Sequence, residues 1–161
     1  MIKRQTVAAL TLSAAAFTGI LVEEGYRGEA YIPVKGDVPT VGFGTTGGVK
    51  PGDTTDPITA LLRAHRDVTA FEGAIKRCVE VPLHQHEYDA LVSFSYNVGS
   101  GAFCSSTLVK KLNQQDYDGA CNELLRWRYA GGYDCSTPGN TRCSGLWERR
   151  KREYQQCMGV A

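Results

Sequence analysis

The stretch Glu24–Thr46 reads EGYRGEAYIPVKGDVPTVGFGTT and decides how the whole chain is interpreted. It opens with a glutamate and a glycine, directly after an apolar run that can be helical. A segment with Tyr31 and Ile32, a turn rich in Pro, Gly and Asp, and the β-prone Thr40–Gly44 follow, which predicts a hairpin. A helix-borne carboxylate facing a hairpin-borne carboxylate is what glycoside hydrolysis requires, because one group protonates the leaving oxygen and the other handles water or the developing cation.

Composition limits the class of protein. A chain of 161 residues forms one compact domain, which can have two lobes. It holds 18 basic and 17 acidic residues, for a formal net charge of +1. Because no strong overall field results, the charge gives no support for nucleic acid as a partner.

The cysteine pattern favours disulfides. The six cysteines are an even number in a small chain, and no two have the C-x-x-C spacing of a zinc or thioredoxin-like site. Disulfides need an oxidising compartment, whereas buried free thiols would fit a cytosolic protein. Cys135 and Cys143 bracket a short loop of Ser, Pro and Gly, so a local bridge is expected there. The six positions are Cys78, Cys104, Cys121, Cys135, Cys143 and Cys157.

An uncharged run, Val7–Val22, precedes the deciding stretch. Lys3 and Arg4 lie before it, so the N-terminal side would stay cytoplasmic and the rest would face outward. Three interpretations remain open: a signal peptide cleaved near Ala16, an uncleaved anchor, and a buried amphipathic core helix. Cleavage after Ala16 would leave seven residues before Glu24. As one helix the run would rise about 24 Å against a hydrocarbon core of about 30 Å, which makes it a marginal span.

Helix signals dominate after the hairpin. Thr55-Asp56-Pro57 predicts a helix start, because a capping side chain precedes a proline in the first turn. His84–Val98 indicates a mostly apolar, central helix that ends at Gly99. Further caps are expected at Ser105 or Ser106, at Asp116 or Asp118, and at Ser144 before a helix over Leu146–Cys157, with a loop over Gly131–Gly145. The pattern predicts an α+β protein that is mostly helical.

The order of these stretches resembles the phage-type lysozymes (endolysins, muramidases). The resemblance rests on Glu24-Gly25, the hairpin and Thr40, and on later motifs that together cover nearly everything after the apolar run. These motifs are HEYDALVSFSYNVG at 86–99, STLVKKLN at 106–113, Arg126-Trp127, and GLWERR at 145–150. The resemblance implies a lysozyme-like fold with a small β-hairpin lobe and a larger helical lobe. The apolar run joined directly to Glu24 is similar to the signal-arrest-release subgroup, which implies a signal anchor over residues 1–22 and a catalytic domain over 23–161.

The resemblance carries catalytic roles to three positions. Glu24 matches the catalytic glutamate, and Thr40 matches a threonine that helps to hold the attacking water. The family's aspartate lies nine residues after the glutamate, where this chain has Pro33, and the threonine falls one residue late. Asp37 is the one carboxylate in this lengthened turn and is the expected second carboxylate, with Glu29 as the alternative. Aspartate in a turn and threonine in a strand are also common for conformational reasons alone.

Two further sets of residues follow from the resemblance. Tyr31 and Asn97 are the expected substrate-binding residues, although Asn97 also fits an ordinary helix end. The packing of the family's helices implies the disulfides Cys78–Cys104 and Cys121–Cys157.

Two further expectations concern the residue after the hairpin and a basic stretch near the end of the sequence. Family members often carry a histidine after the hairpin, where Thr45 or Thr46 stands here, so a salt bridge from that histidine is expected to be absent. Arg149–Arg152 is interpreted as a solvated helix face.

The implied activity is that of a muramidase, which cuts the β-1,4 bond between N-acetylmuramic acid and N-acetylglucosamine in peptidoglycan and so lyses the host cell. Glu24 would be the general acid, Asp37 with Thr40 would position or activate water, and no metal or organic cofactor is needed. One alternative is a lytic transglycosylase that uses Glu24 alone and leaves 1,6-anhydro ends. Another is a membrane-tethered wall-binding module without catalysis.

The expected partners are peptidoglycan and, before release, the inner membrane through residues 7–22. The protein would be a monomer that binds no nucleic acid. Its N-terminus would lie in the host cytoplasm and its domain in the periplasm, where the released enzyme is soluble. Loss of the membrane potential is the implied trigger, since the run contains no cysteine for thiol exchange.

Overall fold

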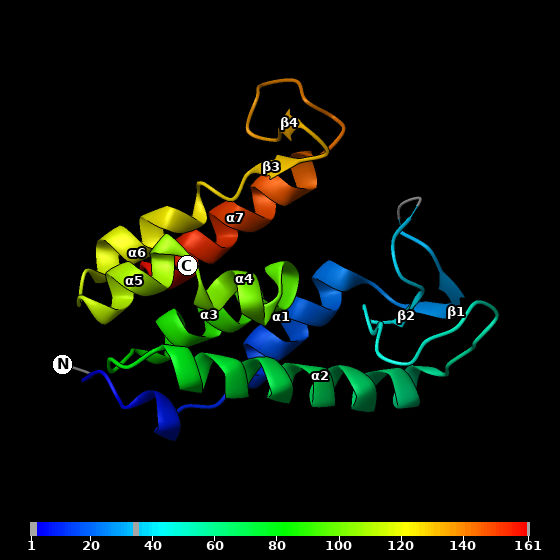
Figure 1. The fold of residues 1–161 in the computed structure, drawn as a ribbon, viewed down its shortest axis with the longest axis horizontal. Coiled ribbons are helices and arrows are strands. Elements are labelled where there is room, and N and C mark those ends of the chain that lie inside the picture. Colours follow the sequence, from blue (N-terminus) through cyan, green and yellow to red (C-terminus); the bar gives the residue numbers. More distant parts are fainter. Residues whose placement is uncertain (1–2, 34–35, 161) are drawn as a thin grey trace. The chain divides into compact units, whose positions relative to one another are not determined.

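The computed structural model describes residues 3–33 and 36–160 (Figure 1). Within these ranges the chain forms seven α-helices, one short 3-10 helix and two antiparallel sheets of two strands each. The predicted class, α+β and mostly helical, is confirmed. The chain divides into a smaller unit, Ala14–Ala70, and a larger unit that combines Met1–Ser13 with Phe71–Ala161. Val34 and Lys35 of the predicted turn lie outside the described residues.

The smaller unit contains the predicted hairpin. Its elements are α1 (Ala14–Glu24), β1 (Arg27–Tyr31), β2 (Thr40–Gly42) and the beginning of α2 (Pro57–Cys78). β1 and β2 are antiparallel, with Tyr31 opposite Thr40. The other edge of β1 is also paired, because the Ala30 N–H donates to the Asp53 carbonyl at 2.8 Å. The strand that follows Glu24 is therefore held on both edges.

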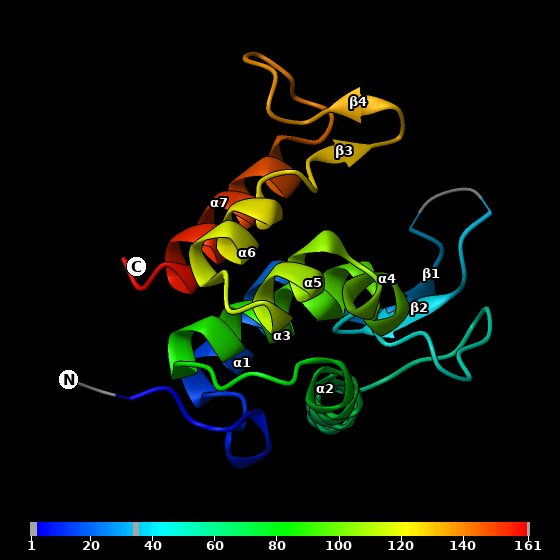
Figure 2. The ribbon, with the colours of Figure 1, turned by 60° about the vertical axis from the view of Figure 1, so that its left-hand side comes forward.

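The larger unit is built around α3. Its further elements are α3 (Gln85–Val98), α4 (Ser100–Cys104), α5 (Thr107–Asn113), α6 (Tyr117–Leu124), β3 (Tyr129–Ala130), β4 (Tyr133–Asp134) and α7 (Ser144–Cys157). α3 packs against α7, and α6 packs against both α5 and α7 (Figures 1 and 2). Tyr88, Leu91 and Phe94 of α3 are fully buried, so its prediction as a central helix is confirmed. The sequence pattern misses α4 and the two-residue strands β3 and β4, since such short elements show no periodicity.

The helix starts follow the capping chemistry of the sequence. Asp56 accepts hydrogen bonds from two backbone N–H groups, at 2.9 and 3.0 Å, and α2 begins at Pro57 as predicted. Of the alternatives left open, Ser106 caps α5 and Asp116 caps α6. Ser144 is the first residue of α7 and not its N-cap, contrary to the prediction.

Three disulfides stabilise the larger unit. They join Cys78 to Cys104, Cys121 to Cys157, and Cys135 to Cys143, with Cα–Cα distances of 5.6, 5.7 and 5.1 Å. These are the three expected pairings. The first joins the ends of α2 and α4, the second joins α6 to the end of α7, and the third closes the loop after β4. Each removes conformational freedom from the unfolded chain, which stabilises the fold by about 2–4 kcal/mol per bridge.

The apolar run does not form one helix in this folded state. Gln5 pairs with Leu83 through two backbone hydrogen bonds of 2.8 Å, and the 3-10 helix Val7–Ala9 follows. Val7 and Leu10 are buried. The chain then leaves helical geometry until α1 begins at Ala14. Of the helices in residues 3–33 and 36–160, none combines the length and apolar character needed to cross a bilayer.

Side-chain carboxylates of the larger unit hold the break in the run. The Leu12 N–H donates to Glu72 at 2.8 Å, and the Ser13 N–H donates to Asp89 at 3.0 Å. These N–H groups are thus satisfied although no helical carbonyl accepts from them. The acceptors lie about sixty and seventy-six positions along the chain, so the sequence around the run gives no sign of the break.

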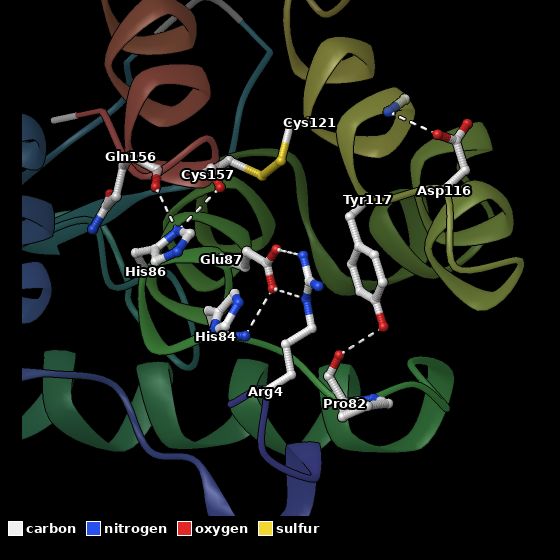
Figure 3. A network of polar contacts seen from close by, with 11 residues as sticks. Arg4, Pro82, His84, His86, Glu87, Asp116, Tyr117, Cys121, Gln156 and Cys157 are labelled. Carbon is white, nitrogen blue, oxygen red and sulfur yellow. Dashed lines mark hydrogen bonds and ion pairs between the residues drawn. A yellow bond between two sulfur atoms is a disulfide. The ribbon is translucent and has the colours of Figure 1, made fainter. Parts of the chain in front are cut away.

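Arg4 anchors the beginning of this segment in the larger unit (Figure 3). Its guanidinium donates two hydrogen bonds to Glu87, at 3.1 and 2.6 Å, and Glu87 also accepts from the backbone N–H of His84 at 2.7 Å. The guanidinium lies 3.6 Å from the centroid of the Tyr117 ring. The hydrogen bond to Glu87 raises the pKa of Arg4. Arg4 therefore makes a paired, bidentate contact with a buried carboxylate.

Candidate active site

Glu24 is the last residue of α1, and the glycine after it explains the Glu-Gly pair of the sequence. Gly25 has a φ of +67°, the left-handed conformation that ends helices and that glycine adopts most readily. Its N–H donates to the Leu21 carbonyl at 3.0 Å, which closes the last turn. The helix therefore stops directly after Glu24 and leaves this side chain half-buried at its end.

A tight turn after β2 brings the backbone against the Glu24 carboxylate. Val41 and Thr45 exchange two backbone hydrogen bonds, of 3.0 and 3.1 Å, across this turn. Gly44 lies within the turn with a φ of +86°, and a Cβ placed on it would lie 3.2 Å from Oε2 of Glu24. This explains why a glycine stands at the end of Gly42-Phe43-Gly44: a side chain at Gly44 would crowd Glu24.

Thr40 begins β2 and is buried. Its hydroxyl donates to the Val38 carbonyl at 3.2 Å. A hydroxyl oxygen also has lone pairs, so the Thr40 oxygen can still accept a hydrogen bond from a water. Tyr31 lies opposite Thr40 in the sheet, with its ring centroid 5.0 Å from the Arg27 guanidinium.

The two candidates for the second carboxylate are both exposed in the smaller unit. Asp37 precedes β2, and its carboxylate accepts a hydrogen bond from the Val38 N–H at 2.9 Å. Glu29 lies within β1 and pairs with Thr54 through an isolated bridge. Glu24, Asp37, Thr40 and Tyr31 thus belong to one compact unit, whereas Asn97 belongs to the larger unit.

Thr45 directly follows the tight turn after β2, and its role is not predicted by the sequence pattern. The residue is buried, and its hydroxyl donates to Oδ2 of Asp67 in α2 at 2.7 Å. A hydrogen bond to a carboxylate thus joins this turn to α2. Because Thr45 follows Gly44 directly, this bond also fixes the backbone that contacts Glu24.

The interpretation of Arg149–Arg152 as a solvated face is wrong for Arg150. Its side chain is 1% exposed and forms an ion pair with Glu153. It also donates to the Trp127 carbonyl at 3.1 Å and to Oδ1 of Asn97. Burial raises the pKa of Glu153, and the adjacent Arg150 opposes that effect. Sequence alone does not reveal this, because the partners lie up to 53 positions away.

Comparison with known proteins identifies the family. A family model described as "Phage lysozyme" matches residues 22–153. The chain belongs to the phage lysozyme family. It is 33% identical to a SAR-endolysin of Bacteriophage PS119, over 98% of this chain and 94% of that protein. It is 36% identical to the endolysin of Salmonella phage P22, over 76% of this chain and 86% of that protein.

Solved structures agree with this lysozyme fold. The endolysin from Escherichia coli O157:H7 phage FAHEc1 has a TM-score of 0.78 at 29% identity, covering 95% of this chain and 96% of that one. A mutant of P22 lysozyme has a TM-score of 0.74 at 32% identity, covering 92% and 99%. As a phage lysozyme, the chain is a glycosidase that cleaves peptidoglycan.

Proposed function

We propose that this lysozyme hydrolyses the β-1,4 bond between N-acetylmuramic acid and N-acetylglucosamine, with Glu24 as the general acid. The observation that carries the proposal is the close approach of the turn at Gly44 to the Glu24 carboxylate, so close that a Cβ on Gly44 would lie 3.2 Å from Oε2. A general acid must hold a fixed position relative to the leaving oxygen, and a half-buried carboxyl against a rigid turn meets that need. Thr45 and Val41 make the turn rigid through the hydrogen bonds described above.

Asp37 and Thr40 supply the water-handling side of the site in this proposal. Thr40 is fixed at the start of β2, three residues after Asp37, and its oxygen can accept from a water. Asp37 is exposed, so its carboxylate is accessible to that water. Tyr31, opposite Thr40, and Asn97, in the larger unit, contact the substrate.

The experiment compares Glu24→Gln with Glu23→Gln, which makes the same chemical change at the neighbouring, exposed position. Glu24→Gln should abolish lysis of purified sacculi without loss of folding, because an amide donates no proton of suitable acidity. Glu23→Gln should lyse as wild type does. Lysis at the wild-type rate by a folded Glu24→Gln protein would refute the assignment.

The second carboxylate and the reaction type are tested together. Asp37→Asn should lower the rate less than Glu24→Gln does, and Glu29→Gln should leave it unchanged. Mass spectrometry of the sugar products should show the addition of one water. Products with 1,6-anhydro ends, together with indifference to Asp37→Asn, would instead identify a lytic transglycosylase that uses Glu24 alone.

We further propose that residues 1–22 form an uncleaved signal anchor, and that the enzyme acts as a soluble monomer in the periplasm after this segment leaves the inner membrane. Relatives named SAR-endolysin match the chain over nearly its full length, which supports the proposal. A physical argument supports it as well. Val7, Leu10 and Ile20 are buried in the folded protein, and they cannot be so while they lie in a bilayer.

Intact-mass analysis of active, soluble protein tests the release. Protein that retains residues 7–22 is expected, whereas a chain starting near Phe17 would indicate ordinary secretion after cleavage. Replacing Thr11, Ser13 and Gly19 with leucine should strengthen membrane anchoring and delay lysis, because each change makes a marginal span more apolar. Activity should be unaffected by a metal chelator.

A further inference from the structure

Arg150 joins three parts of the larger unit. It extends from α7 and donates to the carbonyl of Trp127, which follows α6, and to the side chain of Asn97 near the end of α3. Glu153 offsets its charge, and Glu153 in turn accepts a hydrogen bond from Ser93 at 3.0 Å. Such a cation is costly to bury unless its donors are directed at fixed acceptors. One of those acceptors is the side chain of Asn97, which is exposed.

The chemistry of the guanidinium decides which way the Asn97 amide faces. Arginine has only donors, so the atom of Asn97 that faces it must be the oxygen. The amide is planar, so its NH2 group then faces away from Arg150. Asn97, Trp127 and Arg150 line a cavity of about 650 Å3 in the larger unit. The exposed side of Asn97 therefore offers two N–H donors at the wall of this cavity.

We propose that Arg150 is a positioning residue that orients the Asn97 amide so that its NH2 group donates to an oxygen of bound peptidoglycan. The acceptor is a carbonyl or carboxylate oxygen, either of an N-acetyl group of the glycan or of a stem peptide. This inference rests on the proposed function, in which Asn97 contacts the substrate. It adds the chemical group that is recognised and the residue that makes the recognition possible.

The charges near the cavity also favour an acceptor group. Glu123 is buried in its wall and forms ion pairs with Lys111 at 2.7 Å and with Arg126 at 3.3 Å. Arg150 is paired with Glu153. These five groups comprise three cations and two carboxylates, which leaves one positive charge. The side chain of Arg126 is 74% exposed, so that charge is accessible to an anionic or carbonyl group.

The first arm of the experiment is Asn97→Asp. Aspartate still directs an oxygen at Arg150 but presents an oxygen, in place of the NH2 group, to the substrate. We expect the apparent KM for solubilised peptidoglycan to rise about five- to tenfold with little change in kcat, because a uniform binding contact is lost. The free energy of unfolding of Asn97→Asp should not fall, since the new carboxylate forms an ion pair with Arg150 in place of the hydrogen bond from Arg150 to the amide oxygen. Asn122→Asp, the same change at an exposed residue outside the cavity lining, should leave KM unchanged.

The second arm tests positioning. Arg150→Lys keeps the charge but cannot direct donors at three acceptors at once, so it should raise KM in the wild-type background. In the Asn97→Ala background the same change should leave KM unaffected, although it should lower the free energy of unfolding in both backgrounds. A merely structural Arg150 would change KM equally in the two backgrounds, and this result would overturn the proposal.

The third arm identifies the acceptor. The KM effect of Asn97→Asp is measured on intact chains and on glycan freed of its stem peptides by an amidase. An effect that vanishes on the bare glycan places the acceptor on the stem peptide, and one that persists places it on an N-acetyl group. A wild-type KM for Asn97→Asp on both substrates would overturn the inference. The proposed function would still stand if Glu24→Gln were inactive, so the two failures are distinguishable.

Discussion

Arg4→Met should destabilise the folded protein more than its surface position near the N-terminus would indicate. Arg4 makes two hydrogen bonds to Glu87, which is 3% exposed, and lies over the ring of Tyr117 (Figure 3). Methionine retains the apolar stem but leaves the Glu87 carboxylate buried without its cation. The loss is therefore that of a broken ion pair and not of an exposed side chain.

The magnitude follows from burial. Removing one partner of a fully buried pair costs about 3–5 kcal/mol. The Arg4 side chain is 32% exposed, and Glu87 retains the N–H of His84, so we expect a smaller loss. We therefore expect Arg4→Met to lower the free energy of unfolding by about 2–3 kcal/mol. This total includes about 0.5–1 kcal/mol for the lost cation–π contact with Tyr117. The second change Glu87→Gln should recover about 1 kcal/mol, because it removes the unpaired charge.

Urea unfolding of the full-length soluble protein measures the effect, with Lys3→Met as the matched control. Both variants lose one positive charge before the apolar run, but Lys3 is exposed. Because the pKa of Arg4 is raised, its contribution is fully present below the ordinary arginine pKa and is lost only at still higher pH. The difference in the free energy of unfolding between Arg4→Met and Lys3→Met should thus be constant between pH 6 and 9. If the free energies of unfolding of Arg4→Met and Lys3→Met agreed within about 0.5 kcal/mol, the reasoning would be refuted.

Three other predictions concern the site and its surroundings. Thr45→Val should lower the free energy of unfolding by about 1–2 kcal/mol by removing a buried hydrogen bond, whereas Thr45→Ser should retain most of it, as measured by thermal melts. Gly44→Ala should reduce turnover more than Gly48→Ala does, since both glycines have positive φ but only a side chain at Gly44 would crowd Glu24, the proposed general acid; equal rates would contradict this. The hydrogen bond from Lys111 lowers the pKa of Glu123, so its stabilisation is present above the ordinary value of 4.5 and is lost as pH falls through the lowered value. Acid unfolding curves of Lys111→Met should accordingly show a weaker dependence on pH in that range.

Much of the fold could be predicted because its signals are local. Asp56 before Pro57, Ser106 and Asp116 each cap a helix with a side chain that lies next to it in sequence. The hairpin is marked by turn residues between two β-prone segments. The Glu24-Gly25 pair likewise marks a helix end, which a local rule for left-handed glycine explains.

The features that escaped prediction depend on residues distant in sequence. Arginine is usually found at the surface, so the sequence predicts an exposed side chain at Arg150. Its burial depends on the ion pair with Glu153 and on acceptors distant in sequence, Asn97 and the Trp127 carbonyl. Thr45 gives no sign that Asp67 will accept its hydroxyl. The position of the second carboxylate is also beyond local rules, because a lengthened turn moves Asp37 away from the position that the family pattern assigns.

The apolar run shows why composition alone left three interpretations open. The same weakly apolar residues suit a bilayer and a protein interior, so moving their apolar surface from one to the other contributes little to the choice. In the folded state Val7 and Leu10 are buried, and Arg4 is paired with Glu87. On the proposed release, Lys3 and Arg4 must leave the cytoplasmic side, and the membrane potential opposes this by about 2.3 kcal/mol per charge per 100 mV. Two charges at 100 mV therefore oppose release by about 5 kcal/mol. On this proposal, a collapse of the potential removes that opposition without changing the protein, and so favours transfer of the segment from the membrane to the folded enzyme.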